Sequence, residues 1–204
     1  REIAIYSRDM WAKYTQKAMG HLTTNGMYAH LFINGLYWGL YNPTERIDDD
    51  FCDAHLGGKK EDYDVIKVEE YGVKHVVMAD AGNLDRWNEM FALAENASDM
   101  ATYYAMQGLD ADGNRDAGIE PLLDVDNFID YMLINYYGGN SDWDSHNWLA
   151  VRDRVKGDEG FHFICWDTEH ILKGVNDNCF GTKTNLSPTY LFHKLMDNRV
   201  FKRR

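Results

Sequence analysis

Apolar residues recur along this chain in two patterns, the spacing of a helix face and the alternation of a strand. Helical spacing, in several places ended by glycine, predicts helices over residues 8–19, 48–56, 84–107, 126–137 and 188–198, the third of them broken near residues 96–98. Alternation and β-branched or aromatic runs predict strands over residues 28–33, 36–41, 64–68, 73–77, 148–153 and 161–166. Short strands followed by helices indicate an α+β fold.

The strands are expected to pair locally. Asn34-Gly35, between the first two strands, is the strongest short hairpin signal in the chain. We expect a single domain over residues 1–204, with a smaller strand-rich portion over about residues 1–80. A larger, mainly helical portion over about residues 81–204 then carries the last hairpin, and the two portions are expected to form two lobes that share a cleft.

The last predicted hairpin follows a polar loop that carries candidate chemistry. Asp142 and Asn147 are five residues apart, the D-x-x-x-x-N spacing of the kinase loop that carries the phosphoryl-transfer base. If the two strands fold back on each other, Trp166 falls roughly opposite Trp148, and Asp167 emerges beside Asn147. The hairpin would then gather two acids and an amide at one end of a sheet.

These residue types suit magnesium-nucleotide chemistry. Mg²⁺ takes one or two carboxylate or amide oxygens and keeps its other positions for water and phosphates, so Asn147 and Asp167 are candidate metal ligands. Asp142 is the candidate catalytic residue that orients an acceptor hydroxyl and takes its proton. ATP with Mg²⁺ or Mn²⁺ are the expected cofactors. Three further residues are candidates for auxiliary roles around the metal: Asp144, His146 and Glu169.

Other interpretations of the same residues stay open. Asp, Asn, Ser and Gly favour turns for backbone reasons alone, and the D-x-x-x-x-N spacing by itself is a weak motif. His146 and His170 beside acids also suit water activation by a divalent ion, so a metal-dependent hydrolase is an alternative. A kinase fold that has lost catalysis and serves as a binding or assembly module is another.

Several motifs together carry a family resemblance: Arg8-Asp9-x-Trp11 with Gln16 and Gly20, the stretch from Leu31 through Asn34-Gly35 and Tyr37-Trp38-Gly39 to Glu45-Arg46, Asp126-x-Phe128-Ile129-Asp130-Tyr131, Asp142-x-x-x-His146-Asn147, and Trp166-Asp167-x-Glu169. On these residues the chain resembles the CotH kinase-like family, which is named after a spore-coat protein. The resemblance implies an atypical protein-kinase-like fold, magnesium-dependent use of ATP and a protein or exported-polymer acceptor. It also implies Asp142 as the catalytic residue and Asn147 and Asp167 as metal ligands.

The chain departs from a complete kinase because it has no G-x-G-x-x-G or P-loop pattern. Family members usually carry further strands upstream, so we expect this chain to be a fragment that lacks them. Lys67, in a predicted strand, is a candidate for the ammonium that contacts ATP phosphates, and Glu45 is a candidate ion-pair partner or adenine neighbour. The alternative interpretation is that Lys67 is a solvent-facing strand lysine and Glu45 a surface or hinge acid, without a role in binding. Residues 110–121 resemble a calcium loop but lack its glycine and its final glutamate, so a simple turn is favoured.

Composition excludes some classes of partner. The formal charge of −12 argues against nucleic acid and anionic membranes, because both require a basic surface. No apolar run approaches the roughly 18–20 residues that span a bilayer. Three cysteines without C-x-x-C spacing argue against a structural zinc site or disulfide framework, and Cys165 is expected to be buried. Most aromatic side chains should also be buried, and Trp143, inside the polar loop, is the one for which burial is least expected.

Overall fold

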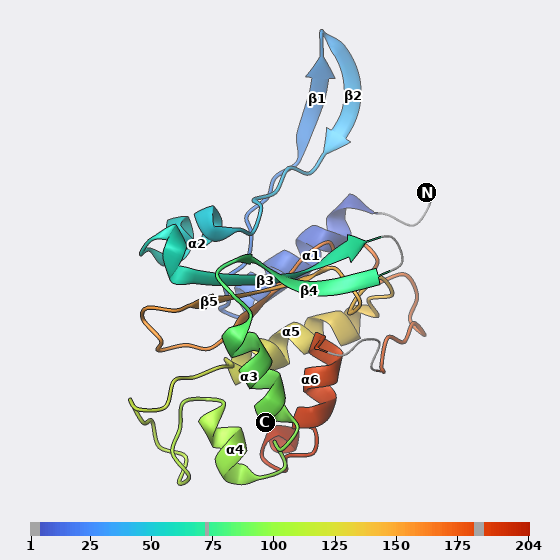
Figure 1. Ribbon diagram of the computed structural model, residues 1–204. Helices are drawn as coiled ribbons and strands as arrows, with labels where there is room; N and C mark the ends of the chain where they lie inside the picture. Colours follow the sequence, from blue (N-terminus) through green and yellow to red (C-terminus); the bar gives the residue numbers. More distant parts are fainter. Residues whose placement is uncertain (1–4, 72–73, 182–185) are drawn as a thin grey trace.

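The computed structural model describes residues 5–71, 74–181 and 186–204 and combines helices with antiparallel strands, so the α+β class is confirmed. Figure 1 shows one body from which the first hairpin projects. The α-helices of the described residues are α1 (Tyr6–Ala18), α2 (Asp49–Leu56), α3 (Asp85–Ala94), α4 (Met100–Ala105), α5 (Val125–Gly138) and α6 (Pro188–Leu195). The strands are β1 (Ala29–Ile33), β2 (Leu36–Tyr41), β3 (Tyr63–Tyr71), β4 (Lys74–Ala81), β5 (Trp148–Asp153) and β6 (His162–Cys165). Short 3₁₀ turns cover Lys60–Asp62 and Phe201–Arg203.

The main sheet has the strand order β4-β3-β5-β6, and every neighbouring pair is antiparallel. Successive side chains along a strand point to opposite faces, so each strand serves two cores. On β5, Trp148 and Ala150 belong to the larger core beneath α3, α5 and α6, whereas Leu149 and Val151 belong to a smaller core with α2. Figure 1 shows these helices on the two sides of the sheet.

The sheet joins strands from both of the expected portions, because β3 pairs with β5 from Tyr63↔Asp153 to Lys67↔Leu149. The expected boundary near residue 80 therefore does not separate two sheets. The helix expected over residues 84–107 is broken as predicted, into α3 and α4. The strands expected over residues 64–68 and 73–77 form as β3 and β4, and both extend further along the chain than expected. Val73, the first residue of the second expected strand, lies outside the described residues.

The free edge of the main sheet at β6 is covered by two buried amides. Gln16, from α1, accepts from Cys165 N at 2.9 Å and donates to Phe163 O at 2.7 Å. Asn127, from α5, accepts from Phe163 N at 2.6 Å and donates to the same carbonyl at 3.2 Å. These bonds satisfy edge groups that would otherwise be buried without partners, and they fix the end of β6 against both helices.

Local sequence explains the ends of the helices beside the loop. Asp124 caps α5 by accepting from Asn127 N at 3.0 Å, and Gly139 ends it in the left-handed conformation at φ 59°. Ser187 caps α6, and Pro188 occupies its first turn, where a missing N–H costs nothing. The polar loop of residues 140–147 therefore begins at a defined helix end.

The first hairpin, β1–β2, lies away from both cores (Figure 1). Its turn at Asn34 and Gly35 has φ values of 51° and 80°, the left-handed pair that the Asn-Gly signal predicts. Many of its large apolar side chains are exposed: Phe32, Ile33, Leu36, Tyr37 and Trp38. Among the described residues, no helix is long and apolar enough to cross a membrane.

The hairpin of β5 and β6 forms as expected, but its register differs by one residue from the prediction. Trp148 pairs with Cys165 rather than with Trp166. The physical reason is burial, because Trp148 and Cys165 both face the larger core, and a shift of one residue would reverse the faces of the whole strand. The end of β6 nevertheless returns the chain to the start of β5, which brings Asp167 to the same end of the sheet as Asn147.

Candidate active site

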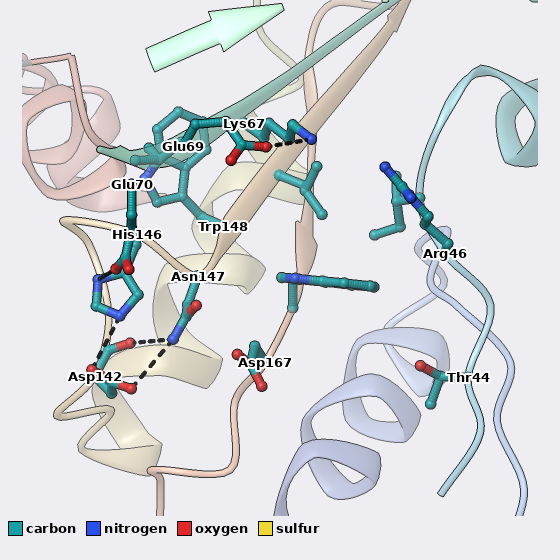
Figure 2. A pocket seen from close by; sticks show the side chains of 14 residues that line it. Thr44, Arg46, Lys67, Glu69, Glu70, Asp142, His146, Asn147, Trp148 and Asp167 are labelled. Carbon is teal, nitrogen blue, oxygen red and sulfur yellow. Dashed lines mark hydrogen bonds and ion pairs between the residues drawn. The ribbon is translucent and has the colours of Figure 1, made fainter. Parts of the chain in front are cut away.

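The start of β5 and the end of β6 border a cavity of about 700 Å³, within the range of roughly 300–1,000 Å³ that is usual for small-molecule sites. Its other walls come from β3 and from the segment that follows the β1–β2 hairpin. Figure 2 shows the side chains that line it. Those that carry most of its chemistry are Arg46, Lys67, Glu70, Asp142, Asn147 and Asp167.

Asp142 lies in this cavity near the start of the polar loop, and its side chain is 40% exposed. Its Oδ1 is 3.2 Å from Nε2 of His146, and its Oδ2 is 3.7 Å from Nε2 of His170. Asn147 Nδ2 donates to the backbone carbonyl of Asp142 at 2.9 Å and lies 3.4 Å from its Oδ2. The two residues are therefore the ends of a short loop, which Asn147 closes through its Nδ2 group. Because Nδ2 makes these contacts, Oδ1 is the atom of the Asn147 amide that could bind a cation.

Three acidic or amide residues in these two segments adopt left-handed backbone. Asp144, Asn147 and Asp167 have φ values of 86°, 59° and 53°. Asn and Asp enter this region more readily than other side chains, yet each such residue costs on the order of 1–3 kcal/mol. Backbone of this kind persists only where the surrounding structure imposes it, and here it sets the path of the two segments that border the cavity.

Asp167 is held in place by helix α1. Asp9 Oδ1 accepts from Thr168 N at 2.9 Å and from Thr168 Oγ1 at 3.0 Å, which fixes the turn immediately after Asp167. Asp9 Oδ2 also pairs with Nζ of Lys13 at 2.6 Å, and that ammonium lies 5.4 Å from the ring centroid of Trp166. Buried Lys13 and partly buried Asp9 therefore support the segment on both sides of Asp167.

Glu169 faces a second cavity of about 470 Å³ that shares Thr44, Trp166 and Asp167 with the first. Burial raises the pKa of Glu169 to about 7, and a hydrogen bond that its protonated form donates to Asp167, together with the negative charges of Asp167 and Asp9, adds to that rise. A carboxyl group in this position retains a proton near neutrality because it is partly buried and, to a lesser degree, because it lies beside other acids. A bound cation would relieve the same repulsion.

Lys67 lines the first cavity from β3, but the expected ion pair with Glu45 does not form. Lys67 Nζ instead lies 2.6 Å from Asp80 Oδ1 and 2.7 Å from Glu69 Oε1. Burial lowers the pKa of Lys67, but the bonds to these two carboxylates outweigh that effect, and the net pKa is raised. Lys67 is therefore a charged ammonium at the cavity wall.

Glu45 lies outside both cavities. Its carboxylate accepts from Asn25 N at 2.6 Å and lies 3.0 Å from Nε2 of His55, so it ties the base of the β1–β2 hairpin to α2. The next residue, Arg46, does line the first cavity, and its only ion pairs among the described residues are long, 3.8 Å to Asp48 and 3.9 Å to Asp80. Figure 2 shows Arg46 and Lys67 pointing toward each other across the cavity.

Two expectations for the polar loop are corrected. Asp144 is not an auxiliary metal residue facing the cavity. It is fully buried and accepts from Ser187 Oγ at 2.8 Å, from Thr189 N at 2.9 Å and from Thr189 Oγ1, all at the start of α6. Trp143 is buried as well, with Nε1 donating to the hydroxyl of Tyr131 at 2.7 Å. The loop turns two consecutive residues, Trp143 and Asp144, into the core, and the left-handed backbone at Asp144 is part of that turn.

The donor set of the first cavity fits a divalent cation. Among the described lining residues, four carboxylates (Glu69, Glu70, Asp142 and Asp167) face two permanent cations (Arg46 and Lys67). This excess of negative charge disfavours a nucleotide alone and favours one that arrives with Mg²⁺ or Mn²⁺. Asn147 and Asp167 both line this cavity, and Asn147 Oδ1 and the carboxylate of Asp167 are the candidate hard oxygen ligands for such an ion.

Sequence reasoning from residue chemistry missed Asp9, Lys13 and Arg46. A partial signal was present for the first two, because an acid and a lysine four residues apart on a helix are candidates for an ion pair, but this spacing does not show that the pair faces the core. For Arg46 there was no such signal, because the direction of its side chain depends on how the segment after the β1–β2 hairpin returns to the main sheet.

A family model described as CotH kinase protein matches residues 8–204, nearly the whole chain. No curated protein matches this chain.

Proposed function

This chain belongs to the CotH kinase family, and on that premise we propose that it is a phosphotransferase that uses ATP with Mg²⁺ or Mn²⁺. The acceptor class proposed is a hydroxyl group of a protein or of an exported polymer. The observation that supports this proposal most is that Asp142, Asn147 and Asp167, from two separated segments, line one cavity of nucleotide size.

Each of these residues has a role that its contacts allow. Asn147 Oδ1 and the Asp167 carboxylate would hold the metal ion, which would neutralise charge on the phosphate oxygens when it is bound. Asp142 is open to solvent on one side and lies in the same cavity, so it can orient an acceptor hydroxyl and take its proton. Asn147 Nδ2 holds Asp142 in place through the bonds that close the loop.

The two cations of the cavity are candidates for phosphate contacts. Within the described part of the chain, Arg46 has only long ion pairs and can turn toward an anion at little cost. Lys67 already contacts Asp80 and Glu69, so a phosphate would have to compete with these two carboxylates. This pairing favours a second candidate function, a kinase-fold binding module without turnover, in which Lys67 stays in its ion pairs.

Measurement of ATP turnover separates the two candidates. The chain is incubated with ATP and Mg²⁺, phosphate release and transfer are followed, and a calorimetric titration measures Mg-ATP binding. We expect turnover to fall at least about 100-fold in Asp142→Ala and in Asp167→Ala, since a general base and a metal ligand each contribute on this scale.

Asp158→Ala is the matched control, because Asp158 is an exposed acid at the far end of the same hairpin. It should keep full turnover. Wild-type turnover in both site variants would refute the assignment of the residues. Binding of Mg-ATP without any turnover would favour the binding module.

A further inference from the structure

Outside the predicted magnesium ligands, three metal-binding side chains from three segments converge at the rim of the cavity. Glu70 comes from β3, His75 from β4 and His146 from the polar loop. Their ligand atoms all lie within 4.8 Å of one another. Glu70 Oε1 is 3.8 Å from Nε2 of His75 and 3.7 Å from Nδ1 of His146, and the two imidazole rings meet edge to face at 5.2 Å.

The hydrogen bond of His75 decides which of its nitrogens carries a proton. Nδ1 lies 2.8 Å from the backbone carbonyl of Ser145. A carbonyl oxygen can only accept, so Nδ1 is the protonated nitrogen when the ring is neutral. Nε2 then presents its lone pair, and this is the nitrogen that faces Glu70.

The same reasoning applies to His146, which lies between Glu70 and Asp142 in Figure 2. Nε2 lies 3.2 Å from the carboxylate of Asp142, so it donates there and Nδ1 presents its lone pair toward Glu70. Ser145 Oγ lies 3.0 Å from Nδ1, and its hydroxyl can rotate away when another group takes the lone pair. A histidine that ligates a metal usually donates its other N–H to a carboxylate or a backbone carbonyl, and both partners are present here.

The spacing of the three ligand atoms suits a small transition-metal ion. Ligands about 2.0–2.2 Å from a tetrahedral zinc ion lie roughly 3.3–3.5 Å apart, so side-chain shifts of a few tenths of an ångström bring the two carboxylate–imidazole distances into range. Two imidazoles and one carboxylate prefer zinc and its neighbours to Mg²⁺, whose ligands are oxygens.

We propose that Glu70, His75 and His146 form a binding site for Zn²⁺ or a chemically similar divalent transition metal, separate from the magnesium ligands of the proposed kinase site. An ion there links β3, β4 and the polar loop, and through His146 it fixes the carboxylate of Asp142. The inference concerns metal binding and stands whether or not the chain transfers phosphate.

Cobalt is the probe, because tetrahedral Co²⁺ gives strong visible absorption and Zn²⁺ displaces it. The chelator-treated protein is titrated with Co²⁺ and then with Zn²⁺, and the melting temperature is measured with and without Zn²⁺. We expect one Co²⁺ per chain with a tetrahedral spectrum, displacement by Zn²⁺, and a higher melting temperature with Zn²⁺ because the ion binds only the folded site.

His75→Ala should abolish the spectrum and the thermal shift. Asp142→Asn, which changes only the partner of a ligand, should weaken Co²⁺ binding by roughly 10–100-fold. His55→Ala is the matched control, because His55 also lies beside a carboxylate, 3.0 Å from Glu45, but has no second histidine within ligand range among the described residues. It should bind Co²⁺ as the wild type does. If His75→Ala misfolds, Glu70→Gln replaces it.

The proposal is overturned if the wild-type protein shows no tetrahedral Co²⁺ spectrum, or if His75→Ala or Glu70→Gln keeps it while folded. Loss of Co²⁺ binding in folded His75→Ala supports the metal site, and absent turnover with intact Co²⁺ binding in the wild type refutes only the proposed kinase activity.

Discussion

Replacing Asp144 by alanine should strongly destabilise the protein, whereas the same replacement of Asp142 should leave its stability almost unchanged. The two acids lie in one loop and have the same side chain. Asp144 is fully buried and accepts three hydrogen bonds from Ser187 and Thr189 at the start of α6. Asp142 is 40% exposed and faces the cavity.

The magnitude follows from the donors that Asp144→Ala would leave without an acceptor. Each buried unsatisfied donor costs about 1–3 kcal/mol, and the carboxylate that is removed no longer has to be desolvated, which offsets part of the loss. Breaking a buried charged network from one side typically costs about 3–5 kcal/mol, and we expect a loss in this range. Asp142→Ala removes only partly solvated contacts, for which about 0.5 kcal/mol is expected.

Urea denaturation followed by far-ultraviolet circular dichroism measures both variants. With a slope of roughly 2 kcal/mol per molar urea, a loss of about 4 kcal/mol lowers the midpoint by about 2 M, and the slope itself should not change. Asp144→Asn keeps one acceptor oxygen and should fall between the two. The reasoning is refuted if Asp144→Ala unfolds within about 0.3 M of the wild type, or if Asp142→Ala loses as much as Asp144→Ala.

Three further predictions concern the supports of the site and the core. Asp9→Ala removes both hydrogen bonds to Thr168, so its ATP turnover should be lower than that of the wild type. Asp9→Asn keeps an acceptor oxygen and should have a turnover between those of Asp9→Ala and the wild type. Equal turnover in the two variants would contradict a positioning role for Asp9. Asp64→Ala removes the buried carboxylate that pairs with Arg152 at 3.1 Å and accepts from Asn83 N at 2.9 Å, while Glu120 still pairs with Arg152; it should cost about 1–3 kcal/mol in urea denaturation, and a change below about 0.5 kcal/mol would argue against a stabilising role of Asp64. Burial raises the pKa of the Cys52 thiol to about 12, so at pH 8 a thiol reagent should label it only after unfolding; rapid labelling of the native protein would show that the thiol is accessible.

Local signals were sufficient for most of the secondary structure. Asn34-Gly35 predicted a turn that needs left-handed backbone, and the structure has it at both positions. The break near residues 96–98 separated α3 from α4 as expected. Turn chemistry and helix ends depend on neighbouring residues in the chain, and for that reason they can be read without knowledge of the fold.

Partners distant in the chain could not be read in the same way. The Asp142 and Asn147 spacing predicted a loop, and the hairpin predicted that Asp167 returns beside it, because both depend on local geometry. The Lys67 and Glu45 pair was wrong, since Lys67 points to Asp80 and Glu69 on its own sheet.

The sequence by itself determined the strands, the helices and the set of oxygen-bearing side chains that could serve a metal and a nucleotide. Only the tertiary structure decided which of these side chains face the cavity and which face the core, as Asp142 and Asp144 illustrate. The physical reason is that a strained loop can turn successive residues in opposite directions, and the direction depends on packing against α5 and α6 rather than on residue type.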